Sequence, residues 1–375
     1  MQDINQNNIF IAGGGTGGHL FPAITIGNCL QKYGMNVIYI GSKHGIEKKY
    51  FSDNNLNAEL LDIKGIQRNL SLNSIIKNLY FPIRFIKSYL KSRQLIKKLK
   101  PKIIIGTGGY SSGMPLLAGV HMDVPTMIQD QNSIPGLITR RLCKKVNLVC
   151  TAYNNVVNIL KTDNIVLTGN PLRENLKAID KHKAINILGL DINKKTILIL
   201  GGSQGSQVIN NHVNKNIDYY DNDKYQLFLQ CGNNNFDKIS NKAHNSKNII
   251  VKKFINDIST VYSAADIVVS RAGALAISEL CYMGKAIILI PFKFAADNHQ
   301  KLNANSIQSQ KACITINESK LSIGELERTI SDLLNNEKKI RDLERNAKRI
   351  SIDNSTEKIV ANIKYIINGK NIRKN

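Results

Sequence analysis

The chain has 375 residues, and 42% of them are hydrophobic, enough to bury the cores of two domains. Its 51 Lys and Arg against 28 Asp and Glu give a net charge of +23, which favours an anionic partner: nucleic acid, a phosphate-bearing substrate or a membrane surface. No apolar run approaches 18 residues, which excludes a membrane-spanning helix, and the polar start lacks the pattern of a signal peptide. The six cysteines form no CxxC pair, so we expect reduced, mostly buried thiols in a cytoplasmic protein.

The first half of the chain has the pattern of a parallel α/β sheet. An apolar run at 8–12 stops at a glycine loop, 13–18, and a helix-like stretch over 20–33 and a strand over 37–40 follow. Further buried strands are predicted at 103–105, 125–128 and 148–150.

The pattern then restarts. A strand at 196–200 runs into a second glycine loop, 201–206, and a helix-compatible segment. Further strands are predicted at 227–229, 249–251, 267–269 and 286–290, and two helices over 326–367. Each half begins with a glycine loop, so we predict two doubly wound domains, with the turn at Gly169, Asn170 and Pro171 as the candidate hinge.

The first glycine loop contains the spacing GxGxxG, which alone is a weak dinucleotide fingerprint. An NAD enzyme needs an acidic residue at the end of the second strand, and residues 40–43 contain none. The loop also lacks the Lys of a phosphate-binding Walker loop. The loop therefore predicts a site where a ligand approaches the backbone closely, with a helix N-terminus behind it and the imidazole of His19 beside it. The alternative for His19 is an ordinary packed or solvated residue.

The second domain has two candidate anion sites. Backbone N–H groups of the 201–206 loop, with the hydroxyls of Ser203 and Ser206, suit a phosphate, and residues 271–275 lead into a helix that carries Glu279. A diphosphate at a helix N-terminus and a carboxylate for ribose hydroxyls would describe a nucleotide-sugar site. The alternative for Glu279 is a solvated helix position.

Polar clusters follow two further strands, at 129–132 and 297–300, where open α/β sheets place their ligands. Either cluster alone could be an ordinary loop. Asp221 and Asp223 have the Asp-x-Asp spacing of metal-dependent sugar transferases, but they lie in a polar stretch that we interpret as a solvated turn. We therefore predict no catalytic metal.

Together these motifs resemble the MurG family of bacterial N-acetylglucosaminyltransferases over nearly the whole chain. The residues that carry the resemblance are 14–19 with Pro22, 108–113, Gln131 and Asn132, 169–173, 201–205, 271–279, and 297–300 with Asn303 and Ala304. The resemblance implies the α/β GT-B fold, in which two Rossmann-like doubly wound parallel-sheet domains face each other across a cleft. It implies an acceptor and membrane-docking domain at 1–167, a UDP-GlcNAc-binding domain at 168–350, and a helix at 351–375 that packs back on the first domain.

The resemblance also implies roles for individual residues. In the donor site, Ile255 would offer backbone groups to uracil, Glu279 would hold the ribose hydroxyls, and Arg173 and Gln300 would contact phosphate or sugar. His19, Gly109 and Tyr110 would contact the acceptor. Thr16, Gly17 and Gly18, together with His19, would face the reacting centre and the acceptor diphosphate. The complete donor-binding set is Thr16, Gly17, Gly18, Asn132, Arg173, Ser203, Ile255, Ala274, Leu275, Ala276, Ile277, Ser278, Glu279 and Gln300.

The implied reaction is an inverting transfer of GlcNAc from UDP-GlcNAc to the 4-hydroxyl of MurNAc in undecaprenyl-linked lipid I, which gives lipid II for peptidoglycan synthesis. His19 is the first choice for the general base, and Asp130 is the second. The family often has Glu at position 130, Thr at 276 and Gln at 299, where this chain has Asp, Ala and His. No metal or cofactor is implied, because backbone N–H groups can stabilise the leaving diphosphate.

The segment 63–122 contains no Asp or Glu, and its Lys and Arg residues interleave with apolar ones. The lipid-linked acceptor would require docking on anionic lipids, and this segment suits that role. The alternative is an ordinary amphipathic helix with its apolar side in the core. The expected place is the cytoplasmic face of the bacterial inner membrane, as a peripheral protein, with other cell-wall synthesis proteins as potential partners and no nucleic acid.

Two other classes of function stay open from the residues alone. Another GT-B enzyme, such as a glycolipid-forming transferase or a UDP-sugar epimerase, would share the fold. A non-enzymatic binder of nucleic acid or membrane would explain the charge, but it would leave the glycine loops without a role.

Overall fold

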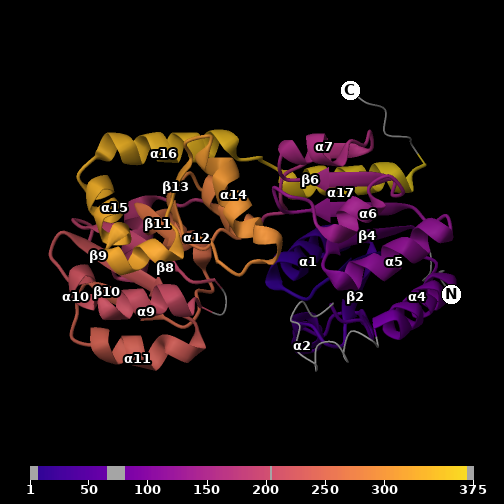
Figure 1. Cartoon of the computed structure of the whole chain (residues 1–375), viewed down its shortest axis with the longest axis horizontal. Helices are drawn as coiled ribbons and strands as arrows, with labels where there is room; N and C mark the ends of the chain where they lie inside the picture. The colour runs from indigo at the N-terminus through magenta and orange to yellow at the C-terminus, as the bar shows by residue number, and fades with distance from the viewer. Residues whose placement is uncertain (1–6, 66–80, 203–204, 370–375) are drawn as a thin grey trace. The chain divides into compact units, whose positions relative to one another are not determined.

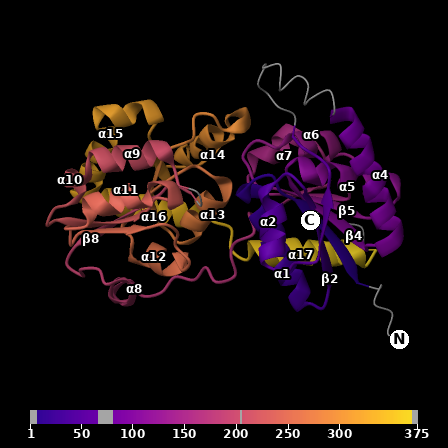
Figure 2. The same ribbon diagram turned by 90° about the horizontal axis from the view of Figure 1, so that it is seen from below.

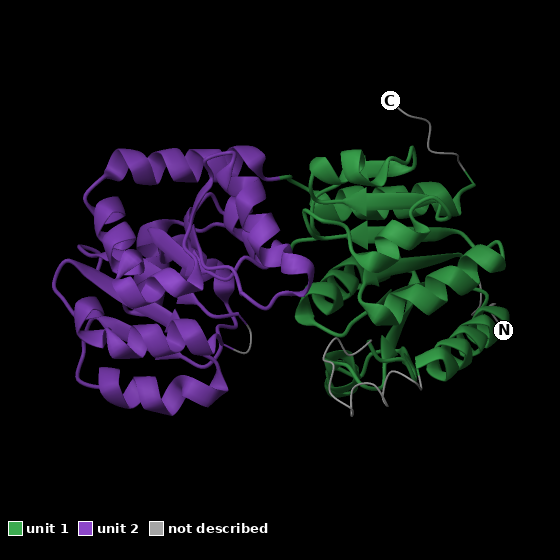
Figure 3. Cartoon of the chain, in the orientation of Figure 1, with its two compact units in different colours: residues 1–172, 352–375 green, residues 173–351 purple. Residues whose placement is uncertain are grey.

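The computed structural model describes residues 7–65, 81–202 and 205–369. The chain divides into two compact units (Figure 3). Unit 1 comprises residues 1–172 and 352–375, and unit 2 comprises residues 173–351. The chain therefore leaves unit 1, forms the whole of unit 2 and then returns to unit 1.

Within its described residues, unit 1 contains a parallel sheet in the order β3-β2-β1-β4-β5-β6-β7. The central strands are apolar over nearly their whole length, because helices cover both faces of a parallel sheet. The strands are β1 (Asn8–Gly13), β2 (Asn36–Ser42), β3 (Ala58–Leu61), β4 (Ile103–Gly108), β5 (Thr126–Asp130), β6 (Leu148–Thr151) and β7 (Ile165–Leu167).

The C-terminal helix α17 completes the core of unit 1. It lies beside α1 (Figures 1 and 2), and Ile359, Val360 and Ile363 are buried in one cluster with Ile9 and Leu20. The helices of this unit are α1 (Gly17–Lys32), α2 (Ile46–Asp53), α4 (Phe81–Leu99), α5 (Tyr110–His121), α6 (Leu137–Leu142), α7 (Asn155–Leu160) and α17 (Ser355–Ile367).

Unit 2 repeats the design with a parallel sheet in the order β10-β9-β8-β11-β12-β13 across its described residues. Figure 2 shows α9 and α15 on one side of β8 and α8 and α12 on the other. The strands are β8 (Lys195–Leu200), β9 (Tyr225–Gln230), β10 (Ile249–Lys252), β11 (Ile267–Ser270), β12 (Ala286–Leu289) and β13 (Cys313–Thr315). The helices are α8 (Lys181–Leu188), α9 (Gln207–Lys215), α10 (Ile217–Tyr220), α11 (Asn233–Ala243), α12 (Ile258–Ala264), α13 (Ala274–Tyr282), η1 (Ala296–Asn298), α14 (His299–Gln308), η2 (Glu318–Ile323), α15 (Glu325–Leu334) and α16 (Glu337–Ile350).

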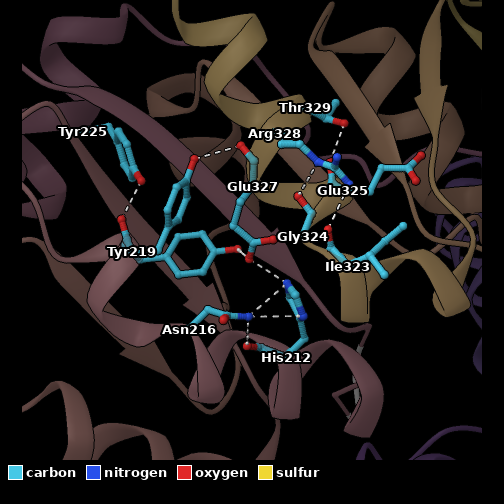
Figure 4. A network of polar contacts seen from close by, with 11 residues as sticks. His212, Asn216, Tyr219, Tyr225, Ile323, Gly324, Glu325, Glu327, Arg328 and Thr329 are labelled. Atoms are coloured by element: carbon cyan, nitrogen blue, oxygen red, sulfur yellow. Dashed lines mark hydrogen bonds and ion pairs between the residues drawn. The ribbon is translucent and has the colours of Figure 1, made fainter.

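A buried polar network joins α9 and α10 to α15 (Figure 4). His212 Nε2 lies 2.6 Å from Glu327 Oε1, and the hydroxyl of Tyr220 donates to the same oxygen at 3.3 Å. The Tyr219 hydroxyl donates to the Glu327 carbonyl oxygen at 2.9 Å. Burial acts to raise the pKa of Glu327, but hydrogen bonds, that from His212 foremost, hold it below its usual value. The network fixes α15 against α9 and α10.

Two details differ from the sequence expectations. The stretch 326–367 forms three helices rather than two, because Asn336 caps a new helix with its side chain and residues 351–354 cross to unit 1. Three short edge strands, β3, β7 and β13, were not expected, since three or four residues leave little apolar pattern.

The prediction of unpaired, mostly buried cysteines is confirmed: all six are unpaired, and all but Cys29 are buried.

Candidate functional site

In unit 1 the strand order reverses between β1 and β4, the point where open α/β sheets form a ligand crevice. The loop after β1 leads into α1 with Thr16 as its N-cap. The loop after β4 leads into α5 with Gly109 as its N-cap. The predicted residues Thr16, Gly17, Gly18 and His19 and the pair Gly109 and Tyr110 therefore belong to adjacent strand ends.

His19 lies against the second of these loops. A Cβ atom on Gly108, whose φ is +100°, would lie 2.6 Å from His19 Cδ2, so only glycine leaves room for the ring. Thr16 Oγ1 is 3.3 Å from His19 Nδ1, and Thr107 Oγ1 donates to the His19 carbonyl oxygen at 2.8 Å. These contacts hold the imidazole at the mouth of the crevice.

Asp130 ends β5 and is buried. Its Oδ2 accepts from Gly136 N at 2.9 Å and from Thr139 Oγ1 at 2.5 Å, and its Oδ1 accepts from Asn132 N at 3.2 Å. Burial raises the pKa of Asp130, and these hydrogen bonds oppose the rise. Both carboxylate oxygens are thus engaged in shaping the loop that carries Asn132, which is a structural task.

Side-chain amides connect this loop to the end of unit 1. Gln131 donates to the Thr107 carbonyl oxygen at 2.8 Å, and Gln129 donates to Asn170 Oδ1 at 3.2 Å. Asn170 donates in turn to the Gln131 carbonyl oxygen at 3.1 Å. The turn expected as a hinge is therefore bound to unit 1 through Asn170, and the chain passes to unit 2 after Leu172.

In unit 2 the strand order reverses between β8 and β11. The second glycine loop follows β8, and Gly273, the N-cap of α13, follows β11. Ala274, Leu275 and Ala276 form the first turn of α13, and the N-terminus of a helix suits an anion. Ile277 and Ser278 continue this helix. Ser203, the predicted diphosphate contact, lies outside the described residues.

Two of the predicted donor-binding residues, Arg173 and Glu279 of α13, contact each other. Arg173 Nε lies 2.9 Å from Glu279 Oε1, and the Tyr262 hydroxyl donates to Glu279 Oε2 at 3.2 Å. Burial raises the pKa of Glu279, against the opposing effects of Arg173 and Tyr262. A carboxylate has about four lone-pair positions, so these two partners do not use all of them. Tyr262 was missed from the sequence, where nothing sets it apart from a core residue.

Gln230 was also missed. It ends β9, donates to the Gly202 carbonyl oxygen at 2.9 Å and accepts from Ile255 N at 2.9 Å. It therefore fixes the base-binding candidate Ile255 relative to the glycine loop, and it occupies the Ile255 N–H. Its position at a strand end was the available signal.

Arg271 supports the loops instead of facing an open anion site. Its Nη2 donates to Ser206 Oγ at 2.6 Å, and its Nη1 donates to the Ile290 carbonyl oxygen at 3.0 Å and pairs with Glu318 at 2.7 Å. In the loop after β12, the N–H of Phe292 donates to Oε1 of Gln300, on α14, at 3.0 Å. Arg271 thus ties the loop after β11 to the loops that follow β8 and β12 and to η2.

Helix α4 forms residues 81–99 of the acid-free segment, and β4 and α5 belong to the same segment. Residues 66–80 lie outside the described part of the chain. Ile83, Ile86 and Leu90 follow the spacing i, i+3, i+7 and are 52%, 56% and 55% exposed, whereas Leu95 and Ile96 are buried. Lys87, Lys97 and Lys98 are exposed on the same helix. No helix in the described ranges is long and apolar enough to span a bilayer.

The two parallel sheets, with glycine loops at both switch points, have the GT-B fold. Models of glycosyltransferase family 28 define the chain as a glycosyltransferase of this class: the N-terminal domain of the family matches residues 9–151 and the C-terminal domain matches residues 196–363. A crystal structure of Acinetobacter baumannii MurG superposes with a TM-score of 0.76 at 24% identity, covering 96% of this chain and 99% of that one. The predicted fold class is confirmed.

Comparison with curated relatives shows which family of glycosyltransferases the chain belongs to. A transferase from Flavobacterium psychrophilum is 38% identical over 364 residues, 96% of this chain and 98% of its own length. One from Bacillus subtilis is 32% identical over 356 residues, 94% and 97% of the two chains. Both are named UDP-N-acetylglucosamine–N-acetylmuramyl-(pentapeptide) pyrophosphoryl-undecaprenol N-acetylglucosamine transferase. The chain belongs to this family of transferases, the MurG family.

Proposed function

We propose that this protein transfers GlcNAc from UDP-GlcNAc to the 4-hydroxyl of MurNAc in undecaprenyl-diphosphate-linked MurNAc-pentapeptide, with inversion at the anomeric carbon. The product is the lipid-linked disaccharide used for peptidoglycan synthesis. The observation that carries the proposal is near-full-length similarity to transferases of that name, combined with two switch points lined by glycine loops.

The donor half of the reaction is proposed for unit 2. The first turn of α13 supplies backbone N–H groups for the diphosphate, and Glu279, aligned by Arg173 and Tyr262, accepts from the ribose hydroxyls. Gln230 fixes Ile255 beside the glycine loop. In this position the backbone carbonyl group of Ile255 can face the uracil ring. Fixed N–H dipoles stabilise the charge that grows on the departing UDP, so we propose that no metal or cofactor is required.

The acceptor half is proposed for unit 1. His19 accepts the proton of the attacking hydroxyl, because its ring is held at the crevice by Thr16 and by the glycines after β4. Asp130 is the weaker candidate, since both of its oxygens accept hydrogen bonds within its own loop. Gly109, Tyr110 and the N-terminus of α1 would bind the acceptor, and Asn132 and Gln300 would reach the donor sugar.

A peripheral place at the cytoplasmic face of the inner membrane completes the proposal. The exposed stripe on α4 would insert between anionic lipids while the neighbouring lysines bind headgroups, each worth ~1 kcal/mol near the surface. Contacts with other cell-wall synthesis proteins would follow from that location.

Donor binding is the first test. Calorimetric titration with UDP-GlcNAc and with UDP-GalNAc, each with and without magnesium, should show preferential, metal-independent binding of the first sugar. In Glu279→Ala the ribose loses a charged hydrogen-bond acceptor worth about 1.5–3 kcal/mol, so Kd should rise about 10- to 100-fold.

Glu337→Ala is the matched control, because Glu337 is an exposed glutamate on α16 of the same unit. It should bind UDP-GlcNAc as the wild type does. Absence of binding of either sugar by folded wild-type protein would contradict the donor assignment, and steeply salt-dependent nucleic-acid binding would then become the better hypothesis.

A further inference from the structure

Glu47, on α2, is a fully buried carboxylate that the proposed reaction does not use. Its exposed fraction is 0%. Oε2 accepts from Gly15 N at 2.8 Å, in the loop after β1, and Oε1 accepts from Ser42 N at 2.9 Å, at the end of β2. One side chain thus joins the first glycine loop to the neighbouring strand end.

The space around this side chain is made by glycines. A Cβ atom on Gly41 would lie 2.6 Å from Glu47 Cγ, and Cβ atoms on Gly14 or Gly45 would overlap the carboxylate itself. Tyr110, whose ring lies 2.8 Å from a Cβ built on Gly15, closes another side of the loop. These glycines therefore fit the glutamate as well as leaving the backbone open to a ligand.

The charge of Glu47 is compensated by backbone dipoles. In the described part of the chain no Lys, Arg or His forms an ion pair with it. A buried carboxylate is retained at a cost unless its oxygens accept good hydrogen bonds, and here two main-chain N–H groups provide them. Such N–H groups in a glycine loop are the ones that would otherwise bind a phosphate oxygen.

We propose that Glu47 is a positioning residue that fixes the first glycine loop by occupying the anion position at Gly15 N–H. The loop is thereby divided in two. Its first half, Gly14 and Gly15, is filled by the protein's own carboxylate, and its second half, from Thr16 to the start of α1, faces the diphosphate of the acceptor. This inference rests on the proposed function and assigns the place of the acceptor within the crevice.

The isosteric variant Glu47→Gln tests the hydrogen bonds without removing volume. A glutamine can accept one of the two N–H bonds, but it directs an NH₂ group at the other. We expect kcat to fall at least tenfold and KM for the lipid acceptor to rise, with Kd for UDP-GlcNAc unchanged because unit 2 is untouched. Hydrogen exchange at Gly15 and Ser42 should accelerate in the same variant, and this readout does not depend on activity.

The truncation Glu47→Ala leaves a cavity with two N–H donors, which formate can fill. Sodium formate should restore part of kcat and slow the exchange at Gly15, whereas sodium chloride at equal ionic strength should do neither. Asp53→Asn, a change to an exposed acidic residue on the same helix, is the matched control and should behave as the wild type.

Three outcomes overturn the inference. Wild-type kcat and exchange in Glu47→Gln would show that the carboxylate does not hold the loop. Loss of the folded unit 1 in both variants would make Glu47 a folding residue instead. Absence of formate rescue in a folded Glu47→Ala would remove the anion position. A wild-type protein without transferase activity would contradict the proposed function alone, because the exchange measurements would still report on the loop.

Discussion

At the scale of single residues, the imidazole of His19 is the group on which the proposed chemistry depends most. We predict that His19→Ala lowers kcat by about 10²- to 10⁴-fold, the usual contribution of a general base, and leaves the Kd for UDP-GlcNAc unchanged. Steady-state kinetics, with calorimetry for the donor, would measure both effects.

His44→Ala is the control for this experiment. His44 is in the same unit, and its Nε2 lies 2.7 Å from Asp62 Oδ1 in a partly exposed pair. Its loss should leave kcat near the wild-type value. Near-normal kcat in His19→Ala would transfer the proton-acceptor role to Asp130, whose Asn variant would then be the next to measure.

The residues found from sequence are those beside glycine loops. His19 and Glu279 could be selected because a glycine run and a helix start mark where a ligand approaches the backbone. Glu47, Gln230 and Tyr262 each act through at least one partner that lies 17–32 positions away in the chain, and no local pattern reveals such a contact.

At the scale of elements, α4 presents the exposed stripe of Ile83, Ile86 and Leu90. We predict that the double change Ile86→Asp and Leu90→Asp weakens binding to anionic vesicles at least tenfold, since it replaces insertion with repulsion; about 1.4 kcal/mol is enough. Transfer to a soluble acceptor analogue should be unchanged. Vesicle co-sedimentation over a salt series would measure the affinity.

Ile187→Asp provides the matched control, because Ile187 is 59% exposed on α8 of unit 2. It should bind vesicles as the wild type does. Equal binding of the wild type to neutral and anionic vesicles, or no effect of the double change, would count against the membrane role of α4.

The strands show where the hydrophobic pattern of a sequence predicts secondary structure correctly. The buried central strands were predicted within a few residues, because runs such as Ile103, Ile104 and Ile105 are apolar on both faces. For α4 the sequence could not distinguish a membrane-docking helix from an ordinary amphipathic helix with its apolar side in the core. The structure divides the helix: Leu95 and Ile96 are in the core, and Ile83, Ile86 and Leu90 are exposed.

At the scale of the whole molecule, the second crossing of the chain makes α17 part of unit 1. We predict that a chain ending at Ser351 loses the folded unit 1 and keeps unit 2. Ile359, Val360, Ile363 and Ile366 are buried there. Each contributes roughly 1.5–3 kcal/mol, which together rivals the 5–15 kcal/mol stability of a typical domain.

Scanning calorimetry with and without UDP-GlcNAc would test this. The truncated protein should retain one transition, and the ligand should shift it upward because it binds the native state of unit 2. A second, ligand-independent transition in the truncated protein would show that unit 1 is stable without α17.

The return of the chain to unit 1 also determines the order in which the two units can fold during synthesis. A ribosome makes residues 7–172 first, but they lack the helix that covers Ile9 and Leu20 until residues 355–367 have emerged. Unit 2 is one continuous stretch, and a nascent chain can fold it as soon as it is exposed. The unit that is synthesised first is therefore the unit that finishes folding last, and an incomplete chain lacks the folded unit in which we propose the acceptor site.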